Sequence, residues 1–113
     1  MATNYKVLGQ SNPSATTATS LYTVPAATQA IVSTITVCNQ AATAATYRIA
    51  VRKAGAALGA SQYLAYDVSL PANTSDTLTL GITLDYSTAG DIITVYSSSA
   101  TMSFAAFGSE ITA

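Results

Sequence analysis

The chain has 113 residues, a typical size for one domain, and only 8% of them are charged, whereas soluble domains average about 25%. Its net charge is −1 with four lysines and arginines, which excludes the broad basic surface that nucleic-acid binding requires. It contains no histidine, the commonest general base and zinc ligand, and no apolar run long enough to span a membrane.

Alternation of apolar and polar residues, which is typical of β-strands with one buried face, recurs along the chain. Residues 1–20 are expected to form an N-terminal arm, or a short strand plus a loop, because 11–20 are small and polar and include Pro13. Residues 21–113 are expected to form a β-sandwich domain. The expected strands are 5–8, 21–24, 31–39, 46–53, 62–70, 77–84, 91–96 and 101–107.

The stretch 31–53 organises this pattern, because it contains two strands joined by a short Ala/Thr loop. We expect these two strands to pair with each other. In the second strand, the odd positions Tyr47, Ile49 and Val51 alternate with Thr46, Arg48, Ala50 and Arg52, so one face is predicted to be buried and the other exposed.

Three later strands are also expected to have one buried side. Their predicted core sets are Leu64, Tyr66, Val68 and Leu70; Leu78, Leu80, Ile82 and Leu84; and Met102, Phe104 and Ala106. Gly81 is expected to mark a bulge or a close backbone approach, and residues 109–113 are expected to form a closing tail.

About eight short strands, regular turn signals and no helix-capping pattern predict an all-β fold. The expected architecture is a single-domain antiparallel β-sandwich, either jelly-roll or Ig-like.

The charged residues and the cysteine form no pattern that is typical of catalysis or of metal binding. No catalytic residue, cofactor or metal site is expected, and the chain is not expected to be an enzyme. Asp85 and Asp91 flank one turn and carry the oxygen ligands that calcium prefers, but turn-capping roles fit their strand-end positions better. Cys38 is the only cysteine, which precludes an internal disulfide, and it is expected to be buried and inert. With no secretory signal at the N-terminus, folding in a reducing cytoplasm is expected.

The seven tyrosines leave a binding role open. Tyr63 lies in the polar register of its strand and is the best candidate for an exposed ring, whereas Tyr47 and Tyr66 are predicted to be core residues. An exposed ring is typical of carbohydrate-binding modules, and tyrosine is also enriched in protein interfaces.

Several segments resemble a known group of proteins. These segments are YKVLGQSNP (5–13), LYTVPAATQAIVSTITVCN (21–39), GITLDYSTAGDIITVYSS (81–98) and FGSEIT (107–112). They resemble small virion structural proteins of tailed bacteriophages, which are β-sandwich proteins of the capsid-decoration or tail-associated type. The likeness spans almost the whole chain, and its motifs are structural rather than catalytic.

The resemblance implies a capsid decoration, or cement, protein that binds the outer capsid shell and bridges capsomers. The alternatives are a tail, baseplate or fibre component and a carbohydrate-binding module. Expected partners are the major capsid protein or other virion proteins and further copies of the chain, as a trimer or dimer, without nucleic acid or membrane. The expected location is the outer capsid surface or the tail of the virion, after synthesis in the host cytoplasm. The candidate interface residues are Asn4, Tyr5, Lys6, Arg48, Arg52, Lys53, Tyr63 and Glu110.

Overall fold

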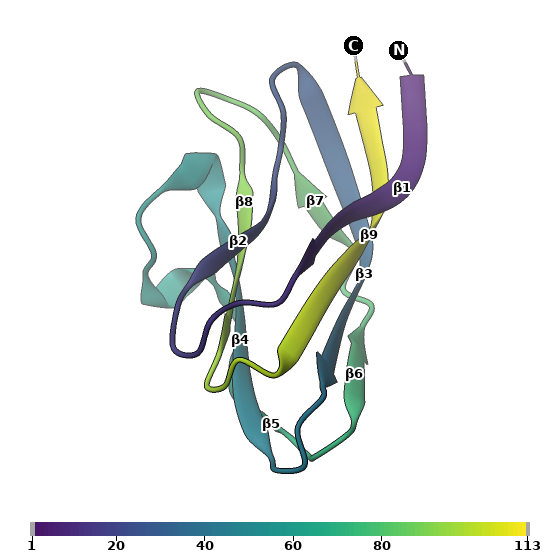
Figure 1. The fold of residues 1–113 in the computed structure, drawn as a ribbon. Coiled ribbons are helices and arrows are strands. Elements are labelled where there is room, and N and C mark those ends of the chain that lie inside the picture. The colour runs from purple at the N-terminus through teal and green to yellow at the C-terminus, as the bar shows by residue number, and fades with distance from the viewer. Residues whose placement is uncertain (1, 113) are drawn as a thin grey trace.

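The structure is a computed structural model that describes residues 2–112, and it confirms the predicted all-β fold (Figure 1). Two short 3-10 turns lie between the fourth and fifth strands. The elements are β1 (Ala2–Ser11), β2 (Thr19–Thr23), β3 (Thr28–Asn39), β4 (Ala45–Arg52), η1 (Lys53–Gly55), η2 (Ala60–Gln62), β5 (Tyr63–Leu70), β6 (Ser75–Leu78), β7 (Ile82–Leu84), β8 (Ile92–Ser97) and β9 (Met102–Thr112). No helix within 2–112 is long and apolar enough to cross a membrane.

The strands form two antiparallel sheets that pack face to face. Sheet A has the order β1-β9-β3-β6, with β7 also paired to β3, and sheet B has the order β2-β8-β4-β5. If β6 and β7 are counted as halves of one strand, the eight strands run 1-8-3-6 in one sheet and 2-7-4-5 in the other. This order is that of a jelly roll, which decides between the two sandwich types expected from the sequence.

The expected pairing between 31–39 and 46–53 is wrong. β3 belongs to sheet A and β4 to sheet B, so the loop between them carries the chain from one sheet to the other. The buried Asn39 holds this crossing: its Nδ2 donates to the carbonyls of Thr43 (2.9 Å) and Leu70 (3.1 Å), and its Oδ1 accepts from the Ala41 N–H (3.1 Å). Alternation of apolar and polar residues predicts strands, but it does not show which strands are neighbours in a sheet.

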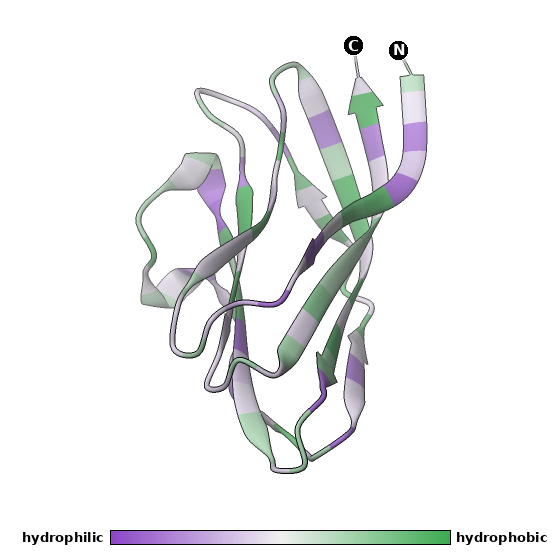
Figure 2. Ribbon diagram, viewed as in Figure 1, coloured by the Kyte–Doolittle hydropathy of each residue, from purple (hydrophilic) through white to green (hydrophobic). Residues whose placement is uncertain are grey.

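The core lies between the sheets and confirms the predicted sides of β4 and β9. Tyr47 and Ile49 from sheet B are buried, as are Met102, Phe104 and Ala106 from sheet A. The rings of Tyr47 and Phe104 meet edge to face across the two sheets, with centroids 6.2 Å apart. Figure 2 shows a hydrophobic stretch along the middle of β9 and a hydrophilic band near its C-terminal end.

The predicted core side of β5 is confirmed at Leu70 and wrong at Leu64, Tyr66 and Val68. Leu64 and Tyr66 are 46% and 57% exposed, and the buried residues of this strand are Ala65 and Leu70. β5 is an edge strand whose register with β4 shifts twice, and Asp67 has a positive φ of 49°. A bulge at this point changes which alternate residues face inward, so the two ends of the strand follow opposite registers.

The predicted strand 77–84 is broken in two. β6 pairs with one end of β3 and β7 with the other, and Gly81 between them has φ +62°. Leu80 is 49% exposed instead of belonging to the core.

β9 is longer than predicted, since it continues to Thr112 and includes most of the expected tail. It lies between β1 and β3, and the starts of β1 and β3 pair with its end, as Figure 1 shows. Gly108 marks a register shift in the β3–β9 pairing, and a Cβ atom there would clash with the Ile31 carbonyl.

Candidate interface surfaces

The charged residues of the sheet A strands lie on the side that faces sheet B, and the Lys6 side chain, near one end of the sandwich, remains 47% exposed. Lys6 Nζ lies 2.9 Å from Glu110 Oε1, and the Tyr22 hydroxyl donates to Glu110 Oε2 at 2.6 Å. The Tyr47 hydroxyl donates to Asp76 Oδ2 at 2.8 Å. Since Tyr22 and Tyr47 belong to sheet B, these bonds join the two sheets.

These contacts fix the protonation states of the groups. The hydrogen bond from Tyr22, followed by that from Lys6, lowers the pKa of Glu110 below its ordinary value. Burial, followed by the bond to a carboxylate, raises the pKa of Tyr22 and of Tyr47 above that of a free phenol. At neutral pH the carboxylate of Glu110 is therefore ionised and both phenols are neutral.

The outer face of sheet A differs from its inner side, because the described strands place no charged residue there. Alternation and register place no Asp, Glu, Lys or Arg on it within the strands of residues 2–112. We call this surface the sheet A face. Its outward-pointing residues include Tyr5, Val7, Gln10, Ile31, Thr36, Cys38, Thr77, Ser103, Ala105, Phe107 and Ser109.

Cys38 lies on this face, so its predicted burial is wrong. The side chains of Val37 and Asn39 on either side are fully buried, which turns the half-buried Cys38 outward.

One end of the sheet A face is apolar. Tyr5, Val7, Ile31 and Phe107 are 86%, 49%, 41% and 37% exposed. Val7 is directly opposite Phe107, and Tyr5 and Ile31 are both opposite Ser109. The apolar side chains therefore come together across β1, β9 and β3, an arrangement typical of interaction sites.

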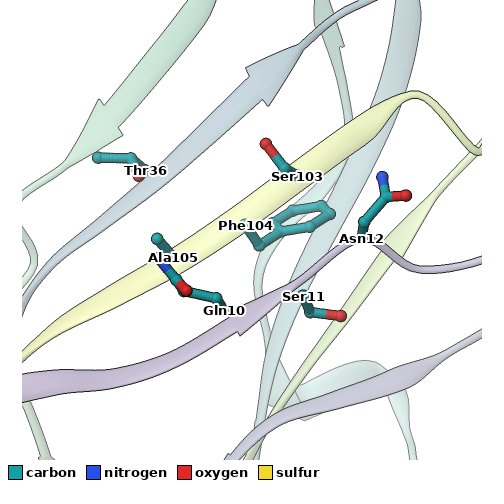
Figure 3. A pocket seen from close by; sticks show the side chains of 7 residues that line it. All are labelled: Gln10, Ser11, Asn12, Thr36, Ser103, Phe104 and Ala105. Carbon is teal, nitrogen blue, oxygen red and sulfur yellow. The ribbon is translucent and has the colours of Figure 1, made fainter.

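A shallow hollow of about 330 Å³ lies next to this end, where β1 meets β9 (Figure 3). Its rim is fixed by Asn12, whose Nδ2 donates to the carbonyls of Ala100 (3.1 Å) and Met102 (2.6 Å). The lining is uncharged and consists of Gln10, Ser11, Asn12, Thr36, Ser103, Phe104 and Ala105.

The outer face of sheet B, unlike that of sheet A, carries an ion pair. Arg48 Nε donates to Asp67 Oδ1 at 2.6 Å, and Nη2 donates to Oδ2 at 3.2 Å. The guanidinium lies 4.2 Å from the Tyr66 ring centre and 4.3 Å from that of Tyr96. The hydrogen bond from Arg48 holds the pKa of Asp67 below its usual range. This cluster is an ordered, self-neutralised ion pair between aromatic rings.

The structure divides the predicted interface residues between two places. Asn4, Tyr5 and Lys6 lie on β1, and Asn4 is directly opposite Glu110 on β9, which is only 8% exposed.

The other four predicted residues lie on the side of sheet B. Arg52 donates to the carbonyls of Ala56 (2.7 Å) and Gly55 (3.0 Å), and Lys53 is exposed. Tyr63 is half-buried, and the exposed ring of this strand is that of Tyr66.

Most of the sheet A face was missed by sequence reasoning. The signal that could have found it is the absence of charge at the outward positions of 31–39 and 101–107, which correspond to β3 and β9, the two longest strands of the structure.

Asp91 has a structural role. Its Oδ1 accepts from the Ala54 N–H at 2.8 Å and its Oδ2 from the Asp85 N–H at 3.0 Å, so it joins two loops. No cluster of three or more Cys, Asp or Glu that could hold a metal ion occurs within the described part of the chain.

The strand order and the all-β content define a jelly-roll β-sandwich. No protein-family model matches the chain, and no curated protein matches it. A solved chain from a structure of infectious bursal disease virus, Gx strain, covers 96% of this chain with a TM-score of 0.52 and 13% sequence identity. This chain spans 30% of the length of that viral chain, and the likeness shows a shared fold.

Proposed function

We propose that the protein is a virion structural protein that binds the outer shell of a capsid and stabilises it by bridging capsomers. The observation that carries this proposal is the sheet A face, an entire strand-built surface without an ionised side chain. The jelly-roll fold, shared with part of a chain in a virus structure, and the resemblance to phage virion proteins support it.

The physical argument concerns desolvation. Covering a hydroxyl or a methyl group removes far less hydration energy than covering an ion, so the sheet A face is covered at low cost. β3 has 12 residues and β9 has 11, and strands lie about 4.8 Å apart, which gives this face an area of roughly 600 Å². Each partner in a standard protein interface buries roughly 800 Å². The face thus approaches the size of a stable contact, and its role is passive adhesion.

Self-association belongs to the same proposal. β1 is at the edge of sheet A, and no strand among the described residues pairs with its other side. The apolar residues Tyr5 and Val7 lie on this edge strand. A dimer or trimer would cover them, and we expect sedimentation of the purified chain to show one.

A pair of charge insertions tests the docking surface. Ala105→Glu, at the middle of the sheet A face, should weaken binding to particles stripped of the protein at least tenfold, because the new carboxylate would be buried without a partner. Ser69→Glu, on the exposed outer side of β5, is the matched control and should bind normally. Equal binding by both folded variants would contradict the proposal.

The position on the particle is a separate question, since a tail, baseplate or fibre component would use the same surface. Gold labelling of intact particles distinguishes a position on the capsid shell from a position on the tail. Label over the capsid shell supports the decoration role, and label on tails alone would replace it with the tail role.

A further inference from the structure

A second hollow, of about 620 Å³, lies on the other side of the molecule, beside sheet B. It is lined by Gly59, Ala60, Tyr63 and Tyr66. The first two residues belong to the excursion between β4 and β5, which Figure 1 shows projecting beside sheet B, and the two tyrosines belong to β5. We call it the tyrosine hollow.

The aromatic walls of the tyrosine hollow are held in place. The rings of Tyr63 and Tyr66 meet edge to face, with centroids 4.8 Å apart and an angle of 85° between their planes. Arg48 stacks on Tyr66 and is itself fixed by its two hydrogen bonds to Asp67. The two rings therefore form a corner whose geometry exists before any ligand arrives.

The floor of the tyrosine hollow is fixed as well. Gln62 Oε1 accepts from the Gly59 N–H at 2.8 Å, and Gln62 Nε2 donates to the Ala57 carbonyl at 3.0 Å. Gly59 and Ala60 have no long side chain to fill the space, and nothing lies within 4 Å of a Cβ built on Gly59.

We propose that the tyrosine hollow binds a neutral saccharide. An aromatic face packs against the C–H face of a sugar ring, and the phenol hydroxyls of the lining tyrosines are partners for sugar hydroxyls. An anionic ligand fits less well, because Arg48 is paired with Asp67 and lies against two rings. The proposal does not depend on the virion role, although docking through the sheet A face would leave this hollow open to solvent.

Two-dimensional amide NMR of the intact chain tests the proposal, with maltohexaose, chitohexaose and mannohexaose added separately up to 10 mM. At least one of them should shift the amide signals of Gly59, Ala60, Tyr63 and Tyr66. Tyr66→Ala should weaken that binding at least tenfold, and Tyr66→Phe should retain most of it because the ring face remains. Tyr5→Ala, which removes an 86% exposed ring from sheet A, is the matched control and should bind like the unaltered protein.

Three outcomes would overturn the inference. One is the absence of amide shifts with all of these sugars and with a neutral glycan array. Another is a set of shifts that Tyr66→Ala leaves unchanged while the spectrum shows a folded protein. The third is binding to sulfated or sialylated glycans alone, which would show that the hollow selects charge.

Discussion

The two sheets of this sandwich place their charges in opposite directions. Lys6, Asp76 and Glu110 of sheet A point inward and bind partners there, whereas Arg48 and Asp67 of sheet B pair on the outside. The outer face of sheet A is consequently a surface of hydroxyl, amide and apolar groups, and that of sheet B is a surface of paired ions and rings. The low overall charge of the chain is thus unevenly distributed, and this difference is the basis for proposing adhesion at one face and ligand binding at the other.

The largest expected difference in stability between the two sides comes from replacing one glycine on each side by alanine. Gly108→Ala should lower the free energy of unfolding by at least about 3 kcal/mol, because its Cβ would collide with the Ile31 carbonyl in the middle of sheet A. Gly59→Ala, beside sheet B, has open space and should change it by less than about 0.5 kcal/mol. Urea unfolding of both variants checks this, and similar midpoints would show that the strands of sheet A are not so closely packed.

The crossing between the sheets should be the next most sensitive place. Asn39→Ala leaves the Leu70 carbonyl and the Ala41 N–H without their partner and should cost about 2–3 kcal/mol. Asn4→Ala, at an exposed position of β1, is the control and should be nearly neutral. Thermal unfolding followed by circular dichroism compares them, and equal stability would mean that Asn39 does not hold the crossing.

The inward charges of sheet A predict a smaller effect. Tyr22→Phe removes one hydrogen bond to Glu110 and should lower the free energy of unfolding by about 1.5 kcal/mol. Tyr5→Phe loses the hydroxyl of an exposed ring and should leave it unchanged. If both variants unfold at the same urea concentration, the bond contributes nothing to holding the sheets together.

The carboxylate of Glu110 also predicts that the stability of the fold depends on pH. The pKa of Glu110 is lower in the folded chain than its ordinary value of 4.5, so the unfolded chain binds this proton more readily. Its contribution to stability is complete well above pH 4.5 and is lost as the pH falls through 4.5 towards the lower folded value. Urea unfolding from pH 7 to pH 3 should show this loss, and Glu110→Gln should flatten it. An unchanged slope in the variant would assign the acid sensitivity to other carboxylates.

The outward charges of sheet B should matter least for stability. Arg48→Gln should leave the unfolding midpoint nearly unchanged, because exposed ion pairs contribute little. It should move the ring-proton NMR signals of Tyr66 and Tyr96, which lose the guanidinium between them. A large drop in stability would show that this pair holds sheet B together, contrary to the contrast between the faces.

Local patterns in the sequence predicted the strands well and their neighbours poorly. The alternation around Ile49 and Phe104 identified core faces correctly because both strands pack between the sheets along most of their length. It failed at Tyr66, where a positive φ at Asp67 shifts the register, and at 31–53, where a short loop resembles a hairpin but changes sheets. Only the tertiary fold decides such points.

The surfaces were harder to predict than the core. Tyr5 was identified because it lies in the N-terminal segment, but its partners Ile31 and Phe107 come from distant strands. Glu110 was expected in the closing tail, whereas the structure places it in β9, buried, with a hydrogen bond from Tyr22 of the opposite sheet. A single sequence shows composition along the chain, whereas a surface is assembled from strands that the fold brings together.

Reactivity of the native thiol tests the central claim most directly, because Cys38 lies on the sheet A face. Alkylation by iodoacetamide, followed by mass spectrometry, would be compared in the free protein and in intact particles. The control is a double variant, Cys38→Ser with Ser69→Cys, which moves the thiol to the outer side of sheet B. We expect Cys38 to react at least tenfold more slowly in the particle and the thiol at position 69 to react at an unchanged rate. Full reactivity of Cys38 in the particle, with protection at position 69, would contradict the assignment of the sheet A face as the docking surface.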